Sequence, residues 1–287
     1  MKSYIGLIAQ LTLGAAAVAP PLELKYPKAA DKWTEALPVG NGLLGEMVFG
    51  GAVAEHYQLN EATLWSGAPV EWNNPKAKDV LPKVREAISA GRYEEAGNLC
   101  KQVQGPYNQT YQPMGDLRLT FPGDAGAVSA NYQRKLELDR AVTTVTYTEG
   151  DAHFTREVFS SHPDQVIVIR LTCDQPGRIN FIATADSQLR FETATAGNNT
   201  LVLRGKAPTH VDPSYIDSND PIRYNDSEGM TFHCQVRAIA QGGSVTGDGK
   251  KLTVEKSDAV TLLLAAATSY NGPDKSPSRD GLDPAAI

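Results

Sequence analysis

Residues 55–75, EHYQLNEATLWSGAPVEWNNP, carry the side chains of this chain that are best suited to bind a sugar. Asn60 and Glu61 stand side by side, Trp65 follows Glu61 by four residues, and Trp72 follows Trp65 by seven. Carboxylates and amides hydrogen-bond to sugar hydroxyls, and aromatic rings pack on the apolar faces of a pyranose. The segment therefore predicts a saccharide-binding surface. A structural interpretation stays open, in which Trp65 anchors a neighbouring element while Asn60 and Glu61 cap a turn.

A second candidate for substrate binding is Asn41, which lies between two glycines in GNGLLG (40–45). Its amide could face substrate or a neighbouring domain, or the residue could occupy a left-handed turn position. The glycines do not indicate a phosphate-binding loop, because the Lys-Ser/Thr pair is missing and a strand-like MVFGG follows where a helix is needed.

Other catalytic and metal-binding patterns are missing from the sequence. It contains no G-x-S-x-G, no H-E-x-x-H and no P-loop. The five histidines are scattered, and His153, His210 and His233 have no carboxylate or cysteine at ligand spacing. The three cysteines fit no zinc pattern. We therefore assign no catalytic residue, no metal ligand and no cofactor from these motifs.

The elements that must position these residues are mainly strands. Alternating apolar residues with β-branched and aromatic enrichment recur along the chain, as in DLRLTFP (116–122), QVIVIRLTC (165–173) and MTFHCQVRAIA (230–240). Residues 79–103 instead have helical spacing, with Gly91 at the expected break. The pattern predicts an all-β fold, a large two-sheet super-sandwich with a helical hairpin inserted at about 79–103.

Composition limits the classes of partner. The 287 residues carry a formal net charge of −6 and no basic block, which argues against a nucleic acid partner. Residues 1–19 have one lysine, an apolar run and small residues, the layout of a signal peptide, so we expect a secreted or periplasmic protein. No second apolar run has the length of a membrane span. The odd number of cysteines allows at most one disulfide within the chain.

Five blocks, in order, carry a resemblance to a known family. They are WTEALPVGNGLLGEMVFGG (33–51), QLNEATLWSGAP (58–69), YQPMGDLRLTF (111–121), REVFSSHPDQVIVIRL (156–171) and VTLLLAAATSYNGPDKSP (260–277). Together they resemble the N-terminal domain of glycoside hydrolase family 95, whose best-known members are inverting α-L-fucosidases.

The resemblance implies a domain organisation. Residues 20–275 would form the β super-sandwich, and residues 276–287 would begin an interdomain linker. A C-terminal (α/α)6 barrel that carries the catalytic residues would normally pack on the sandwich. Since we find no part of that barrel in this sequence, we expect no catalytic residue here. The segment around Asn60, Glu61 and Trp65 would then contribute to the rim of a pocket for a fucosylated glycan.

Two alternatives to a fucosidase domain remain open from the sequence. One is a stand-alone carbohydrate-binding or structural module. The other is a fragment of a related α-L-galactosidase or disaccharide phosphorylase, although the five blocks fit the fucosidase family better.

Overall fold

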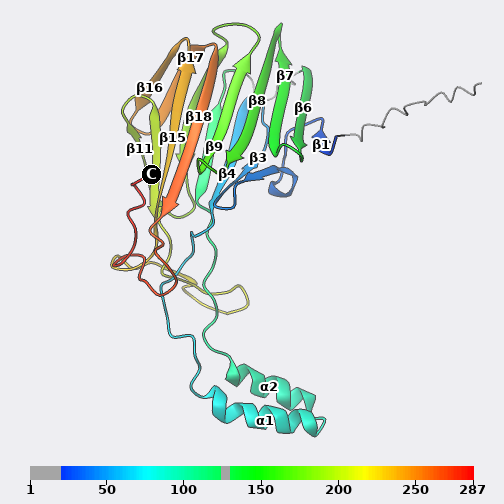
Figure 1. Ribbon diagram of the computed structural model, residues 1–287, viewed down its shortest axis with the longest axis vertical. Coiled ribbons are helices and arrows are strands. Elements are labelled where there is room, and N and C mark those ends of the chain that lie inside the picture. Colours follow the sequence, from blue (N-terminus) through cyan, green and yellow to red (C-terminus); the bar gives the residue numbers. More distant parts are fainter. Residues whose placement is uncertain (1–20, 124–129) are drawn as a thin grey trace, which may run out of the picture.

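The computed structural model describes residues 21–123 and 130–287 of the chain. The signal peptide predicted at 1–19 lies outside these residues. Two large antiparallel sheets, one of nine and one of seven strands, form the body of the molecule (Figure 1). The predicted super-sandwich is therefore confirmed, and the alternating strands account for it because they give each sheet one apolar face.

The nine-stranded sheet combines four consecutive strands from the middle of the chain with the first described strand and the last one. Central strand β18 pairs with β15 over ten residues, from Phe232–Thr268 to Gln241–Ala259. In spatial order its strands are β1 (Glu23–Tyr26), β6 (Ala130–Glu137), β7 (Val142–Glu149), β8 (Ala152–Ser161), β9 (Val166–Cys173), β18 (Ala259–Thr268), β15 (Thr231–Gln241), β12 (Thr200–Lys206) and β11 (Arg190–Ala196).

The seven-stranded sheet carries the segment singled out in the sequence. Strand β4 contains Asn60 and Glu61 and lies between β3 and β5. In spatial order the strands are β16 (Ser244–Asp248), β17 (Lys251–Ser257), β10 (Ile179–Asp186), β5 (Gly115–Thr120), β4 (Ala54–Glu61), β3 (Leu44–Val48) and β2 (Leu37–Gly40). Two further strands of two residues each, β13 (His210–Val211) and β14 (Ile222–Arg223), pair with each other, and a short 3-10 helix spans Trp33–Glu35.

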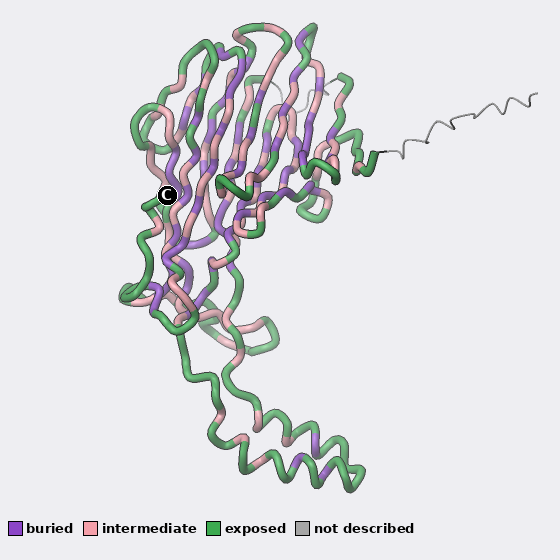
Figure 2. The backbone as a smooth tube through the Cα atoms, in the orientation of Figure 1, coloured by how far each residue is buried: buried purple, intermediate pink, exposed green. Residues whose placement is uncertain are grey.

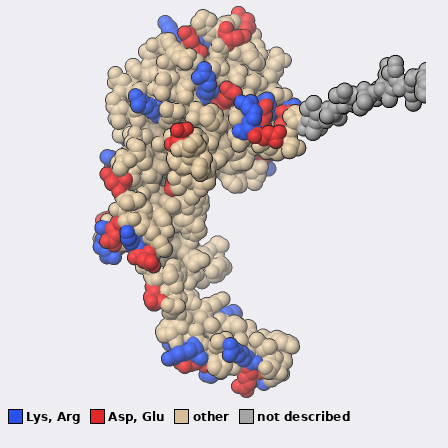
Figure 3. Space-filling model, in the orientation of Figure 1, with Lys and Arg blue, Asp and Glu red and all other residues tan. Residues whose placement is uncertain are grey.

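The core lies between the two sheets. In most strands alternate residues face inward. Examples are Ile167, Ile169 and Leu171 on β9 and Leu117 and Leu119 on β5, and all five are buried. Figure 2 shows the buried residues along the strands, whereas the helical region is largely exposed. Acidic and basic side chains are interspersed over the face shown in Figure 3.

The inserted helical hairpin consists of α1 (Ala77–Ser89) and α2 (Tyr93–Val103), as the sequence predicted. Gly91 ends α1 with a positive φ of 74°. The N–H of Gly91 donates to Ile88 O and that of Arg92 to Ala87 O, which is the Schellman pattern. The hairpin projects from one end of the sandwich, and its helices pack mainly on each other (Figure 1). Neither helix has the length and apolar character of a membrane-spanning segment.

Two extended segments, 62–76 and 104–112, connect the hairpin to the sandwich, and we call them the stalk. They pair where they leave the sheet, since Ser66 N donates to Thr110 O and Gln112 N to Leu64 O, both at 2.9 Å. At the far end, the amide of Asn74 donates to Gln102 O and Gln104 O, each at 2.8 Å. Hydrogen bonds therefore join the two segments of the stalk at both of its ends.

The chain after β18 lies against the sandwich. Ser276 Oγ donates to Glu228 Oε1 at 2.7 Å, and Ser278 Oγ donates to Gly229 O at 2.8 Å. Leu282 N reaches Ser269 O at 3.2 Å. Much of the segment predicted as the start of a linker therefore has a defined position on this domain.

A buried polar cluster joins the two sheets. Arg156 of β8 and Glu55 of β4 are both 2% exposed, and Arg156 Nη1 lies 3.2 Å from Glu55 Oε2. The guanidinium also donates to Gly51 O, Ala52 O and the Tyr147 hydroxyl. Burial raises the pKa of Glu55, while Arg156 and backbone N–H groups oppose that shift. The pair therefore connects strands of opposite sheets across the core.

Glu46 is a second buried carboxyl, 2% exposed on β3. Neither of its side-chain oxygens has a hydrogen-bond partner among the described residues. Burial raises the pKa of Glu46 well above its usual value, and the nearby Glu55 carboxyl acts in the same direction. The three cysteines are all free thiols, with Cys100 exposed on α2, Cys173 half-buried and Cys234 buried.

Candidate functional site

Strand alternation separates the two predicted sugar contacts, Asn60 and Glu61. Glu61 faces the core and is 2% exposed, whereas Asn60 faces outward and is half-buried. The Glu61 carboxylate accepts from Thr63 N at 2.7 Å and from Thr63 Oγ1 at 2.8 Å. Burial raises the pKa of Glu61. These contacts match the turn-capping interpretation for Glu61, and the two neighbouring side chains lie on opposite faces of β4.

Asn60 instead belongs to a chain of contacts on the outer face of the seven-stranded sheet, which we call the platform. Its members are Trp33, Gln58, Asn60, Tyr111 and Trp65. Trp33 Nε1 donates to Gln58 Oε1 at 2.8 Å, Asn60 Nδ2 lies 3.4 Å from the same oxygen, and the Tyr111 hydroxyl donates to Asn60 Oδ1 at 3.4 Å. Tyr111 and Trp65 meet edge to face with ring centroids 5.6 Å apart. The platform thus combines aromatic rings with amides on an open surface.

Asn41 lies near the same end of the sheet, in the turn between β2 and β3. Its Oδ1 accepts from Leu43 N and Leu44 N at 3.0 and 2.7 Å, and its Nδ2 donates to Ser161 O at 3.0 Å. The positive φ of this turn, 91°, belongs to Gly42. The oxygen of the Asn41 amide therefore holds the turn together, while its nitrogen ties the turn to β8, so both ends of the amide form hydrogen bonds within the fold.

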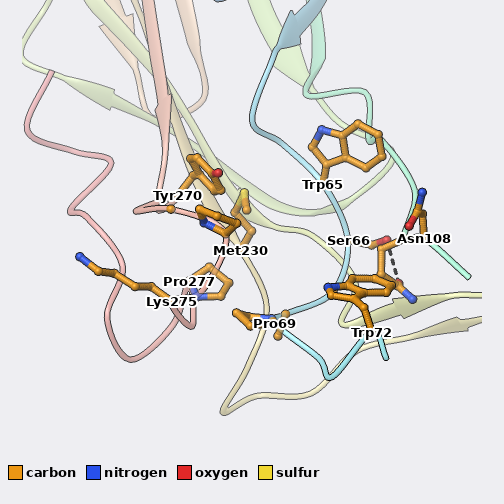
Figure 4. A pocket seen from close by; sticks show the side chains of 14 residues that line it. Trp65, Ser66, Pro69, Trp72, Asn108, Met230, Tyr270, Lys275 and Pro277 are labelled. Atoms are coloured by element: carbon orange, nitrogen blue, oxygen red, sulfur yellow. Dashed lines mark hydrogen bonds between the residues drawn. The ribbon is translucent and has the colours of Figure 1, made fainter. Parts of the chain in front are cut away.

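A cleft of about 330 Å³ opens where the stalk meets the segment after β18 (Figure 4). Trp65 and Trp72 line one side, and Tyr270 with Met230 lies opposite. The complete lining is Trp65, Ser66, Gly67, Ala68, Pro69, Trp72, Asn108, Gln109, Met230, Tyr270, Gly272, Pro273, Lys275 and Pro277. Among the predicted contacts Asn41, Asn60, Glu61 and Trp65, the structure therefore brings Trp65 alone to this cleft.

Some polar side chains that line the cleft form hydrogen bonds within the chain, and others do not. Ser66 Oγ donates to Gln109 Oε1 at 3.1 Å, and Gln109 Nε2 lies 3.2 Å from His210 Nδ1, so both side chains are engaged. Within the described part of the chain, no hydrogen bond engages the side-chain polar atoms of Trp72, Asn108, Tyr270 and Lys275, which also line the cleft.

A charged cluster fixes the stalk beside the cleft. The Asp212 carboxylate accepts from the Tyr107 hydroxyl at 2.5 Å, His210 Nε2 lies 2.6 Å away, and Arg223 Nη1 lies 3.3 Å away. The hydrogen bonds from Tyr107 and His210 hold the pKa of Asp212 well below its usual range. This cluster ties the segment that carries Asn108 to the β13–β14 pair.

The lining of the cleft lacks the pair of acidic side chains that glycoside hydrolysis uses. Hydrolysis of a glycosidic bond with inversion needs two carboxyl groups about 6.5–9.5 Å apart. The lining of the cleft includes no aspartate or glutamate. Nor do residues 21–123 and 130–287 place three or more His, Cys, Asp and Glu side chains where they could hold a metal ion.

Residues 24–273 match the family described as Glycosyl hydrolase family 65, N-terminal domain. The chain belongs to this family, so the prediction of an N-terminal glycoside hydrolase domain is confirmed.

Several known proteins are similar to this chain. It is 37% identical over 275 residues to Alpha-L-fucosidase 2 of Arabidopsis thaliana, covering 92% of this chain and 32% of that protein. It is 28% identical over 291 residues to "Probable alpha-fucosidase A" of Aspergillus oryzae, covering 95% and 37%. A solved structure named "Putative kojibiose phosphorylase from human microbiome" aligns with a TM-score of 0.40 and 11% identity, covering 90% of this chain and 34% of that one. The chain spans about a third of the length of these relatives.

Proposed function

We propose that this chain is the N-terminal domain of an α-L-fucosidase, which hydrolyses terminal α-L-fucosyl linkages with inversion. The observation that carries the proposal is the 37% identity to Alpha-L-fucosidase 2, which extends over 92% of the chain. The match to an N-terminal glycoside hydrolase domain supports the same class.

In this proposal the chemistry belongs to a second domain. We place the acid and base groups in a C-terminal barrel that packs on the sandwich, as the resemblance to family 95 implies. The coverage of about a third of the relatives supports the presence of a further domain in such a protein. The sandwich supplies the surface around Trp65 that borders the pocket. The partner of the whole protein is then a fucosylated oligosaccharide or glycan.

The experiment compares the 287-residue chain with the protein translated from the complete reading frame, each incubated with 2'-fucosyllactose. We expect fucose release only from protein that includes a following catalytic domain, with the inverted anomer appearing first in the NMR spectrum. Release of fucose by the 287-residue chain alone would refute the assignment of the catalytic groups to a second domain. Hydrolysis of an α-L-galactosyl substrate in preference to 2'-fucosyllactose would favour the galactosidase alternative.

We also propose that the protein is exported, through a signal peptide at residues 1–19. The lysine, apolar run and small residues of that segment support this. Mass spectrometry of the N-terminus after expression in the native host tests it, with a mature chain beginning near residue 20 as the expected result. An intact Met1 in the mature protein would contradict export by cleavage.

A further inference from the structure

We propose that the helical hairpin docks a second copy of this chain through one apolar side of its two helices. The hairpin projects from the end of the sandwich, and its helices pack mainly on each other (Figure 1). Neither the sandwich nor the stalk therefore covers this side of the hairpin in the described part of the chain. The inference is independent of the proposed hydrolysis, because it rests on the two helices.

Three large side chains of the hairpin are exposed although they are apolar or aromatic. Leu81 and Ile88 of α1 are 39% and 50% exposed, and Tyr93 of α2 is 73% exposed. Leu81 and Ile88 are seven residues apart and therefore lie on one face of α1. Tyr93 shares a face of α2 with Cys100, which is also seven residues away and exposed.

Helix geometry puts these two faces on the same side of the hairpin. Ile88 follows the buried Ala87 by one position, so it is turned about a quarter of a circle away from the contact between the helices. In α2, Tyr93 and Cys100 are offset from the buried Ala96 by about 40–60° in the same rotational sense. Because the helices run in opposite directions and face each other, the same sense of rotation leads to the same side. We call this surface the apolar side of the hairpin.

The opposite side of the hairpin is polar throughout. Its exposed residues are Asp79, Lys83, Glu86, Glu95, Asn98 and Gln102. A helical layer that is polar on one side and apolar on the other is normally packed against a further element on its apolar side. The distribution of side chains therefore indicates that a protein surface covers the apolar side.

The helices also have little stability of their own. Helices of 13 and 11 residues are marginal in water unless tertiary packing supports them. Pro82 lies inside α1 and has no N–H to donate, and Gly97 lies inside α2. The contact between the helices buries Val84, Ala87 and Ala96. Covering the apolar side would add the burial that the hairpin lacks.

The charges of the two helices complement each other between copies. Helix α1 carries three cations and two carboxylates, a net charge of +1, whereas α2 carries one cation and two carboxylates, a net charge of −1. A two-fold axis along the helices lays α1 of each copy antiparallel on α2 of the other, so opposite charges meet. An axis across the helices would instead bring α1 onto α1. The charges therefore favour an antiparallel four-helix bundle with the first symmetry.

The shape of the molecule leaves room for this arrangement. In Figure 1 the helices run crosswise to the long axis of the molecule, below the sandwich. A two-fold axis along the helices consequently turns the second sandwich to the far side of the bundle, and the two sandwiches do not overlap. Since helices of this length form a small interface, we expect a dissociation constant on the order of 10–100 µM.

Sedimentation velocity of the 287-residue chain tests the proposal, over concentrations from about 1 to about 200 µM. We expect a monomer at the low end and a dimer at the high end, with no larger species, because a two-fold interface is closed. A maleimide should also react with Cys100 more slowly as the dimer forms, since Cys100 borders the apolar side.

Two substitutions that each introduce a lysine separate the apolar side from the rest of the hairpin. Ile88→Lys places a charge on the apolar side and should weaken dimerisation at least about tenfold. Asn98→Lys places the same charge on the polar side and is the matched control, with dimerisation unchanged. Both positions are exposed, so an unfolding midpoint equal to that of the wild type should show that each variant is folded.

Three results would overturn the inference. A monomer over the whole concentration range would mean that a second copy does not cover the apolar side. A dimer that persists in Ile88→Lys, or that is weakened equally in Asn98→Lys, would place the contact elsewhere on the chain. Association that continues beyond the dimer would contradict a closed two-fold bundle. None of these results bears on fucose release, which is measured separately on the complete protein.

Discussion

The Arg156–Glu55 pair yields the sharpest prediction on stability. In Arg156→Met, the Glu55 carboxyl stays buried without its guanidinium partner, and the Arg156 hydrogen bonds to Gly51 O, Ala52 O and Tyr147 are lost. Removing one member of a buried ion pair costs about 3–5 kcal/mol, because the remaining charge is uncompensated. We expect a loss of that size in the free energy of unfolding at pH 8.

The pH dependence has a definite sign. Burial already raises the folded-state pKa of Glu55, and without Arg156 the pKa rises further because the cation no longer opposes the effect of burial. The folded variant therefore keeps a proton that the unfolded chain releases above about pH 4.3. Its stability falls as the pH rises through the folded pKa, so the loss relative to wild type should be smaller at pH 5 than at pH 8.

Urea unfolding at pH 5 and pH 8, monitored by tryptophan fluorescence, measures both the loss of stability and its dependence on pH. The double variant Glu55→Gln/Arg156→Met removes the charge but keeps an oxygen for the N–H groups of Gly50 and His56. It should recover about 2 kcal/mol of the loss at pH 8.

Arg134→Met supplies the matched control for this measurement. Arg134 is a buried arginine that donates to Glu35 O and Lys28 O, and within the described residues it forms no ion pair. Its variant should show a smaller loss that does not depend on pH. A double variant no more stable than Arg156→Met alone would refute the role given to the unpaired Glu55 charge.

Two further predictions concern Glu46 and the helical hairpin. The raised pKa of Glu46 makes the folded protein less stable as the pH rises above the unfolded pKa. Glu46→Gln should therefore show a shallower decline in unfolding free energy between pH 5 and pH 8 than the wild type. Equal slopes for the variant and the wild type would contradict this. Replacing residues 77–103 with a short Gly-Ser linker should change the unfolding free energy of the sandwich by no more than about 1 kcal/mol, because α1 and α2 pack mainly on each other. Loss of the cooperative transition in calorimetry would show that the hairpin supports the sheets.

The fold could be predicted from the sequence because it rests on local patterns. Ile167, Ile169 and Leu171 alternate as a strand requires, and all three are buried in the sandwich. The hairpin was equally clear, since helical spacing and Gly91 mark where α1 ends and α2 follows. Such signals depend on neighbours along the chain, so a single sequence contains them.

The candidate site could be predicted only in part. The same alternation that identifies β4 puts Asn60 and Glu61 on opposite faces, a consequence that grouping them by chemical type overlooked. Trp65 and Trp72, which were singled out for their sugar chemistry, are exposed, and their role in binding stays a prediction. The wall opposite these tryptophans comes from residues 270–277, about two hundred positions further along the chain. The order of strands in both sheets brings the two segments together, and the spacing of residues in the sequence gives no information about that order. No local sequence pattern therefore marked the other residues of these two surfaces, which are Tyr270, Asn108 and Lys275 in the cleft and Trp33 and Tyr111 on the platform.

The unequal exposure of the three cysteines has a practical consequence. Cys100 lies exposed on the projecting hairpin, whereas Cys234 is enclosed in the core, where burial raises its pKa to about 12. Burial also raises the pKa of Cys173, the half-buried thiol. A maleimide probe should therefore attach first at Cys100, at a distance from both the platform and the cleft. A spin label or fluorophore there would report how the hairpin is oriented relative to the sandwich, without any cysteine being added or removed.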